Sequence, residues 1–264
     1  MLTEEERERY ERQIMMREIG ERGQERLKRA RVFIAGAGGL GSPVSLYLAT
    51  AGVGMIRVVD HDSVELSNLN RQVLHWDEDI GKTKAASATE KLKRLNRAVT
   101  IEPIEEIITE SNVSRLVAGF DLIVDAMDNL PTRYLLNKAA VDTNIPFFHG
   151  AVYGFEGRAM TVIPGKTACL RCVYHGVTPE EKFPVIGVTP AVIGCIQATE
   201  VIKYLVGVGE LLTNKLLTYD GLRIQFTEFR VKKNPNCDHC GHLMGRDESE
   251  HKGQHSSESP PPHQ

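Results

Sequence analysis

A glycine-rich turn is the first stretch of this sequence that could hold a ligand. It reads Gly36-Ala37-Gly38-Gly39-Leu40-Gly41 and follows a short apolar run at 32–35. The first glycine of such a pattern permits a tight turn, the second lets a phosphate approach the backbone, and a following helix offers free N–H groups to anionic oxygens. Asp60 ends the next apolar run, where a carboxylate can accept hydrogen bonds from a ribose. The pattern predicts a nucleotide site and leaves the nucleotide open.

Three charged side chains favour a triphosphate over a dinucleotide. Arg71 and Lys84 can neutralise phosphates, and Asp128 can hold Mg²⁺. Adenylyl and phosphoryl transfer need this charge compensation, whereas hydride transfer does not. We therefore predict a nucleoside triphosphate and Mg²⁺ as ligands. Each residue also has a simpler interpretation, which is a solvated surface charge for Arg71 or Lys84 and a helix cap for Asp128.

Four of the five cysteines form two Cys-x-x-Cys pairs, Cys169 with Cys172 and Cys237 with Cys240. A two-residue gap lets both thiolates of a pair face one ion, and two pairs complete a tetrahedral shell of four sulfurs. Because this shell leaves no open coordination position, we predict a structural zinc ion. A redox pair or unmetallated thiols would not explain why both pairs share one spacing.

Alternating strands and helices must position these residues in the first 150 positions. Strands are predicted at 32–35, 55–59, 100–104, 122–125 and 146–148. Helices are predicted at about 3–16, in a second piece before 31, at 42–50, 82–95 and 112–118, and from 131 onward. In the helix at 42–50, Ser42 is expected as N-cap and Pro43 as first residue. The alternation predicts a largely parallel sheet that is covered on both faces.

The pattern changes after Gly150. A strand at 157–163, a helix at 192–206, and strands at 216–219 and 223–229 around Asp220-Gly221 indicate an antiparallel half. We predict an α/β, Rossmann-like, doubly wound sheet whose parallel N-terminal half is continued by antiparallel strands. From Arg246 the sequence loses its apolar residues, and we expect residues 245–264 to be a disordered tail.

The composition weighs against several classes of function. The formal net charge of −3 gives no global attraction for nucleic acid. The sequence opens with acidic residues where a signal peptide would be basic, and it has no apolar run long enough to span a bilayer. We therefore expect a cytoplasmic protein, in which cysteines serve as metal ligands or free thiols more readily than as disulfides. With 264 residues, of which 41% are hydrophobic, the chain can bury one large core.

Taken together, the motifs resemble the MoeB/ThiF/HesA family of ubiquitin-activating-enzyme-like adenylyltransferases. The resemblance covers about residues 3–244. It rests on Tyr10-Glu11-Arg12-Gln13, the turn at 36–41, Asp60 with Ser67-Asn68-Leu69-Asn70-Arg71-Gln72, Lys84, Asp125-Ala126-Met127-Asp128-Asn129, both cysteine pairs, and Gln197-Ala198-Thr199-Glu200.

The resemblance implies a homodimeric adenylating domain at 1–244, with a nucleotide-binding half at about 30–150 and a carrier-binding half at about 151–244. Its substrate would be a ubiquitin-like sulfur-carrier protein that ends in Gly-Gly and is adenylated on its terminal carboxylate, with release of pyrophosphate. A sulfur donor or sulfurtransferase would then attack the activated group. The implied roles are ribose binding for Asp60, phosphate contacts for Asn68, Arg71 and Lys84, Mg²⁺ binding for Asp128, zinc binding for the cysteines, and contact with the partner protomer's ATP for Arg12.

One feature of many family members is missing from this sequence. Their flexible loop carries a further cysteine that attacks the adenylate, whereas the loop at 176–187 here has none. Cys195 is the spare thiol, in an apolar segment where a cysteine is commonly a small buried hydrophobe. We therefore expect adenylation without a thioester on this chain. Phe155 and Phe226 are candidate contacts for the carrier's globular body.

Three other functions agree less well with the sequence. An NAD-binding oxidoreductase shares the glycine-rich turn but does not explain Arg71, Lys84 or the paired cysteines. An ATP-dependent tRNA-modifying dehydratase of the same superfamily fits less well with the acidic net charge and the paired cysteines. A non-catalytic scaffold would not need Arg71, Lys84 and Asp128 together. The resemblance fits carriers of molybdopterin, thiamine, tRNA thiolation and cysteine synthesis equally.

Overall fold

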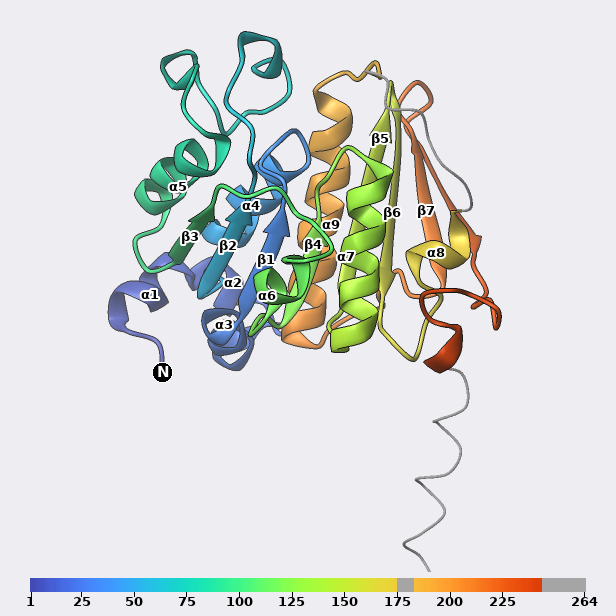
Figure 1. Cartoon of the computed structure of the whole chain (residues 1–264). Helices are drawn as coiled ribbons and strands as arrows, with labels where there is room; N and C mark the ends of the chain where they lie inside the picture. The colour runs from blue at the N-terminus through green and yellow to red at the C-terminus, as the bar shows by residue number, and fades with distance from the viewer. Residues whose placement is uncertain (175–182, 244–264) are drawn as a thin grey trace, which may run out of the picture.

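The computed structural model describes residues 1–174 and 183–243. Their strands form one sheet in the order β3-β2-β1-β4-β5-β6-β7-β8, with helices on both faces (Figure 1). Strands β1 to β5 pair in parallel and β5 to β8 pair antiparallel. The predicted class, a parallel sheet continued by antiparallel strands, is confirmed. The predicted tail at 245–264 lies outside the described residues.

The elements have the following bounds. The strands are β1 Arg31–Ala35, β2 Met55–Val59, β3 Thr100–Ile104, β4 Leu122–Asp125, β5 Phe147–Tyr153, β6 Glu156–Val162, β7 Lys215–Asp220 and β8 Gln225–Arg230. The helices are α1 Glu4–Arg9, α2 Glu11–Ile14, α3 Gly20–Arg29, α4 Gly41–Thr50, α5 Lys84–Leu95, α6 Val113–Val117, α7 Leu130–Thr143, α8 Leu170–Val173 and α9 Val188–Val206. Short 3₁₀ turns are η1 Leu66–Asn68, η2 Asp77–Asp79 and η3 Gly241–Leu243.

Two apolar cores, one on each face of the sheet, hold the elements together. Val32 and Ile34 of β1 join a core shared with α3, α4, α5 and α9. Phe33 joins the opposite core, which is shared with α6, α7 and the cysteine cluster. All three side chains are fully buried, and each contributes about 1.5–3 kcal/mol by leaving water. A strand that is apolar on both faces is what a central parallel strand requires.

The N-terminal helix is broken, contrary to the prediction of one helix at about 3–16. Tyr10 separates α1 from α2 and points inward. Its hydroxyl accepts a hydrogen bond from Asn96 Nδ2 at 2.8 Å. A Cβ on Gly52 would lie 2.5 Å from the Tyr10 ring, so the ring takes the space beside that glycine. The break therefore follows from burial of the tyrosine.

Two other boundaries differ from the prediction because of tertiary contacts. Helix α9 begins at Val188, four residues early, where the Thr189 hydroxyl donates to Gly154 O at 3.0 Å. The β7–β8 turn spans 221–224, since Asp220 Oδ1 accepts from the N–H of Leu222 at 3.0 Å. Within the described parts of the chain, no helix is both long and apolar enough to cross a membrane.

Candidate active site and cysteine cluster

The glycine-rich turn lies at the carboxyl end of β1, between β2 and β4, where the strand order reverses. This is the place at which open α/β sheets bind ligands. Gly36 has φ of +97°, and a Cβ there would lie 2.6 Å from the carbonyl oxygen of Ala126. The turn therefore packs directly against the segment that follows β4 and leads to Asp128. Two predicted parts of the nucleotide site are brought together.

Helix α4 begins inside the turn, at Gly41, with Leu40 in the N-cap position. The prediction of Ser42 as N-cap is wrong, because the N–H of Ser42 already donates to Gly38 O at 2.9 Å. Gly41 allows this early start, since a Cβ there would lie 2.0 Å from Gly36 O. The free N–H groups of the helix start therefore belong to the turn itself.

Asp60, at the end of β2, is tied to the turn. Its Oδ2 accepts from the N–H of Ala37 at 2.8 Å, and its Oδ1 accepts from the N–H of Asp62 at 2.9 Å. Lys84 starts α5 and is buried, with Nζ 2.7 Å from Asp62 Oδ2. Burial alone would raise the pKa of Asp62, but the hydrogen bond and charge of Lys84 hold that pKa below its usual value. Sequence reasoning did not identify this ion pair, which a phosphate contact by Lys84 would have to exchange or share.

Arg71 lies over the glycine-rich turn. Its side-chain Cγ would be 3.6 Å from a Cβ on Gly39, and its guanidinium donates to Ser67 O at 2.8 Å and Asn70 Oδ1 at 3.0 Å. Asn68 is buried in η1 and its Oδ1 accepts from the N–H of Glu65 at 3.1 Å. The polar connection between β2 and α5 thus places Arg71 beside the glycine-rich turn.

Asp128 has an exposed carboxylate after β4. Asn129, not Asp128, caps α7, because Asn129 Oδ1 accepts from the N–H of Thr132 at 2.9 Å. The helix-cap interpretation of Asp128 is therefore wrong. The Asp128 carboxylate is available to a cation, and its chemistry suits Mg²⁺.

A buried carboxylate that sequence reasoning assigned no role holds the turn before Asp128. Asp125 is fully buried, with Oδ2 2.7 Å from His149 Nδ1 and Oδ1 accepting from the N–H of Met127 at 3.1 Å. Arg133 Nε donates to Met127 O at 3.1 Å. Burial lowers the pKa of His149, although Asp125 acts in the opposite direction. His149 lies within an apolar strand and carries no sequence signal.

Gln197 of α9 braces the same turn from the opposite face of the sheet. Its Nε2 donates to Asp125 O at 2.8 Å and to Phe148 O at 3.0 Å. Gly150 makes room for this side chain, because a Cβ there would lie 2.4 Å from the Gln197 amide. The family motif around Gln197 was visible in the sequence, but its bracing role was not.

Arg12 is not brought to the site of its own chain. It is exposed in α2, and its neighbour Gln13 donates to Ala51 O, just beyond the far end of α4. Helix α4 has 10 residues and is therefore about 15 Å long. In Figure 1, α1 to α3 lie at the opposite end of the strands from the loops after β1 and β2. Within one chain, Arg12 and the glycine-rich turn are at opposite ends of the sheet.

The four paired cysteines meet at one point. The sulfurs of Cys169 and Cys172 are 3.9 Å apart, those of Cys169 and Cys237 3.6 Å, and those of Cys172 and Cys240 3.5 Å. A tetrahedral zinc site with Zn–S bonds of about 2.3 Å places its sulfurs about 3.8 Å apart. The cluster therefore fits a closed zinc site, as the spacing predicted.

The fully buried Asn137 of α7 joins the cluster to the domain. Its Oδ1 accepts from the N–H of Leu170 at 2.8 Å, and its Nδ2 lies 2.7 Å from His239 Nδ1. A hydrogen bond from Cys240 lowers the pKa of Cys169, and the same contact raises the pKa of Cys240. One thiolate is thus favoured at the expense of its neighbour.

Cys195 is half-buried in α9 rather than enclosed. It borders an apolar hollow of about 420 Å³ that is also lined by Ala191, Val192, Ile196, Thr199 and Phe226. Burial raises the pKa of the Cys195 thiol. The expectation of an unreactive thiol agrees with this pKa, although Cys195 is only partly buried.

Comparison with known proteins decides the family. The ThiF family matches residues 10–239. The chain belongs to the ThiF family. The resemblance to the MoeB/ThiF group is thereby confirmed. This ThiF-family chain is 47% identical over 240 residues to the SAMP-activating enzyme E1 of Haloferax volcanii, covering 89% of this chain and 88% of that protein.

Two further relatives extend the comparison. The chain is 44% identical over 250 residues to the sulfur carrier protein adenylyltransferase of Thermus thermophilus, covering 90% of this chain and 92% of that protein. The solved structure of E. coli MccB with MccA-N7isoASN superimposes with a TM-score of 0.80 at 27% identity, over 89% of this chain and 74% of that one. MccB has also been solved with ATP.

Proposed function

We propose that this protein is an adenylyltransferase that uses Mg-ATP to adenylate the C-terminal glycine carboxylate of a ubiquitin-like sulfur-carrier protein in the cytoplasm. The observation that carries the proposal is the set of contacts around the glycine-rich turn at the strand-order reversal: Asp60 and Arg71 contact the turn, Lys84 pairs with Asp62, and the segment that leads to Asp128 packs against Gly36. The names of the two relatives from Haloferax and Thermus favour the same activity over NAD-dependent oxidation and over tRNA dehydration.

The site supplies position and charge, which are what attack on the α-phosphorus needs. The helix start at Gly41 and the cations Arg71 and Lys84 would hold the phosphates, and Asp60 would hold the ribose. Mg²⁺ bound at Asp128 would neutralise charge on the pyrophosphate as it leaves. The carrier carboxylate is itself the nucleophile, so the enzyme needs no covalent nucleophile of its own.

Exposed apolar side chains on the antiparallel half are candidate contacts for the carrier. Phe155 and Phe226 are 43% and 49% exposed, and an exposed apolar patch on a protein surface can mark an interaction site. We assign carrier binding to the half at 151–244 and nucleotide binding to the half at 30–150. The body of the carrier would lie on the half at 151–244, while its extended Gly-Gly end reaches the nucleotide in the half at 30–150.

Arg12 fits a role in a homodimer better than a role in its own chain. An exposed guanidinium at the far end of α4 can serve another protomer, where its planar fork suits a triphosphate. The Cys169, Cys172, Cys237 and Cys240 cluster would hold zinc, which would supply stability and leave chemistry to the nucleotide end.

ATP–pyrophosphate exchange tests the proposal. Each member of a panel of Gly-Gly-ended carriers is incubated with enzyme, Mg-ATP and labelled pyrophosphate. We expect exchange with at least one carrier, and loss of that exchange in Asp128→Ala at unchanged thermal stability. Exchange without any carrier, or near-normal exchange in Asp128→Ala, would contradict the proposed mechanism.

A further inference from the structure

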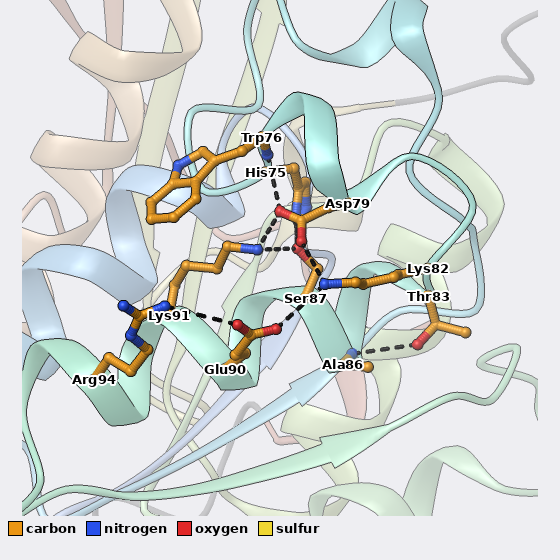
Figure 2. A network of polar contacts seen from close by, with 10 residues as sticks. All are labelled: His75, Trp76, Asp79, Lys82, Thr83, Ala86, Ser87, Glu90, Lys91 and Arg94. Carbon is orange, nitrogen blue, oxygen red and sulfur yellow. Dashed lines mark hydrogen bonds and ion pairs between the residues drawn. The ribbon is translucent and has the colours of Figure 1, made fainter.

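A buried chain of polar contacts ends on the glycine-rich turn. His75, from the connection between β2 and α5, has Nε2 2.9 Å from Ala37 O and Nδ1 2.8 Å from Ser87 Oγ. Lys91 Nζ donates to Ser87 Oγ at 3.1 Å and pairs with Asp79. Figure 2 shows His75, Asp79, Ser87 and Lys91 facing one another between η2 and α5. The two ends of this hydrogen-bonded chain, Ala37 and Asp79, are 42 positions apart in sequence, so only the fold brings its members together.

The hydrogen-bond acceptors around His75 determine which of its ring nitrogens carries the proton. The Ala37 carbonyl can only accept, so His75 carries its proton on Nε2. His75 Nδ1 then accepts from the Ser87 hydroxyl, and the Ser87 oxygen accepts from the Lys91 ammonium. Burial lowers the pKa of His75, as do the charges of Lys84 and Lys91, against the opposite effects of the Ala37 carbonyl and Asp60. The contact with Ala37 thus requires a proton on Nε2, and the lowered pKa favours the neutral form of His75.

Asp79, at the far end of the hydrogen-bonded chain, is held in place by several contacts, and these contacts limit the movement of His75. Asp79 is fully buried and Lys91 nearly so. Asp79 Oδ2 also accepts from the N–H of Trp76 at 2.9 Å, and Lys82 Nζ lies 3.0 Å from Asp79 Oδ1. The Lys91 ammonium lies 4.9 Å from the centre of the Trp76 ring, within the range of a cation–π contact.

The other end of the chain orients one peptide group of the turn. The N–H of Ala37 is held by Asp60 at 2.8 Å and its carbonyl by His75. The peptide bond between Ala37 and Gly38 is trans, so its N–H, which belongs to Gly38, points away from His75. Among the described residues no acceptor takes a hydrogen bond from the Gly38 N–H. His75 therefore turns a free donor of the glycine-rich pattern outward.

We propose that His75 is a positioning residue that acts through the Ala37 carbonyl and aims the Gly38 N–H at a phosphate of the bound nucleotide. The inference rests on the proposed function, because it takes the turn to be the phosphate site. A donor that is fixed before binding loses no freedom when the anion arrives. Asp79, Lys91 and Ser87 serve to hold His75 in the one tautomer and orientation that donate to Ala37.

Two matched variants separate this role from a structural one. In His75→Gln the side-chain amide reaches the position of Nε2 and can donate to Ala37 O. In His75→Asn the amide reaches only the position of Nδ1 and contacts Ser87 alone. Equilibrium binding of ATP, and of adenosine as a ligand without phosphates, is measured for both variants and the wild type, without carrier. Thermal unfolding of each protein is recorded beside the binding.

We expect His75→Asn to weaken ATP binding roughly five- to tenfold, which is the scale of one well-placed hydrogen bond, and His75→Gln to stay within about twofold of wild type. Adenosine binding should be unchanged in both. Nitrogen NMR of the wild type should show His75 neutral with its proton on Nε2. Equal weakening by Gln and Asn, a parallel loss of adenosine binding, or an Nδ1 proton would overturn the inference.

Failure of this inference is distinguishable from failure of the proposed function. Wild-type protein that binds ATP with the expected variant pattern but exchanges no pyrophosphate with any carrier would support the role of His75 and contradict adenylation. Normal carrier-dependent exchange together with equal weakening of ATP binding in His75→Gln and His75→Asn would support adenylation and contradict the role of His75. Wild-type protein that binds no ATP would overturn both.

Discussion

The nucleotide end of the sheet and the cysteine cluster are held together in different ways. At the nucleotide end the buried carboxylates have cationic partners supplied by the chain, as Asp79 has Lys91 and Asp125 has Arg133. In the cysteine cluster, four sulfurs lie within 4.8 Å of one another. Because four thiolates this close together repel one another, they cannot all ionise without a cation.

The difference indicates where an added group is needed for folding. A site whose charges are already compensated can form before its ligand arrives, and its ligand is then free to come and go. A cluster of four thiols needs a cation before all four can ionise. We therefore expect the nucleotide end to be preorganised and the cysteine cluster to depend on zinc.

The largest effect should follow removal of the metal. Elemental analysis should find about one zinc per chain, as a closed four-cysteine site requires. Cys169→Ser should lose zinc and destabilise the fold by on the order of 5 kcal/mol or more, measured by calorimetry. Cys195→Ser is the matched control and should keep both zinc and stability. Wild-type protein whose melting temperature does not change when its metal is removed would contradict the proposed dependence of the cysteine cluster on zinc.

A charge removed from the nucleotide end should have the next largest effect. Lys91→Met keeps the stem over Trp76 but leaves the buried Asp79 short of its main partner, at a cost of about 3–5 kcal/mol. Denaturant unfolding measures this loss, and zinc content should not change. Lys93→Met, on the exposed face of the same helix, should stay within about 0.5 kcal/mol of wild type. Equal stability of Lys91→Met and Lys93→Met would show that the ion pair between Asp79 and Lys91 does not stabilise the fold.

The buried carboxylate of Asp79 should make the stability of the protein depend on pH. Burial would raise the pKa of Asp79, but hydrogen bonds from Lys91, Trp76 and Lys82 outweigh it and hold that pKa well below its usual value. Its contribution should be complete above the unfolded pKa of about 3.9 and should be lost as pH falls below that value. Unfolding curves between pH 3 and 6 should show this loss in wild type, and a smaller one in Lys91→Met.

A mixing experiment tests whether the nucleotide end borrows one residue from the other protomer. Arg12→Ala and Asp128→Ala should each be inactive in pyrophosphate exchange. After subunit exchange at equal amounts, half of the dimers should be mixed, each with one intact site. Activity should return to about a quarter of wild type. Mixed dimers without recovered activity would mean that Arg12 serves its own chain or none.

The smallest effect is expected at Cys195. Its raised pKa makes it a poor nucleophile at neutral pH. Cys195→Ala should retain full pyrophosphate exchange, and enzyme with ATP and carrier should give no thiol-sensitive adduct on a non-reducing gel. An adduct that forms in wild type and disappears in Cys195→Ala would instead make Cys195 a catalytic thiol.

The sequence predicted the elements well because their signals are local. Val32 to Ala35 form a strand that is apolar on both faces, and the shared spacing of the two cysteine pairs predicted that four sulfurs meet at one point. Boundaries failed where a distant contact decides them, as at Tyr10, which breaks a helix by turning toward Asn96. Such contacts have no local signature.

The candidate site was predictable only in part. The glycine-rich turn and Asp60 lie together as predicted. Ser87 and Lys91 share a helix face at a spacing of four residues, but nothing in the sequence pairs them with His75 across an irregular connection. His149 is hidden in an apolar strand, so its contact with Asp125 could be found only from the fold.

The most direct test of the account is the chemical fate of the carrier. A carrier that supports exchange is incubated with enzyme and Mg-ATP, and its intact mass is measured beside a version that lacks the terminal glycine. We expect a carrier adenylate with the intact tail, none with the shortened tail, and none with Asp128→Ala. Mg-ATP consumed with the carrier mass unchanged, or adenylate formed equally on the shortened tail, would contradict this expectation.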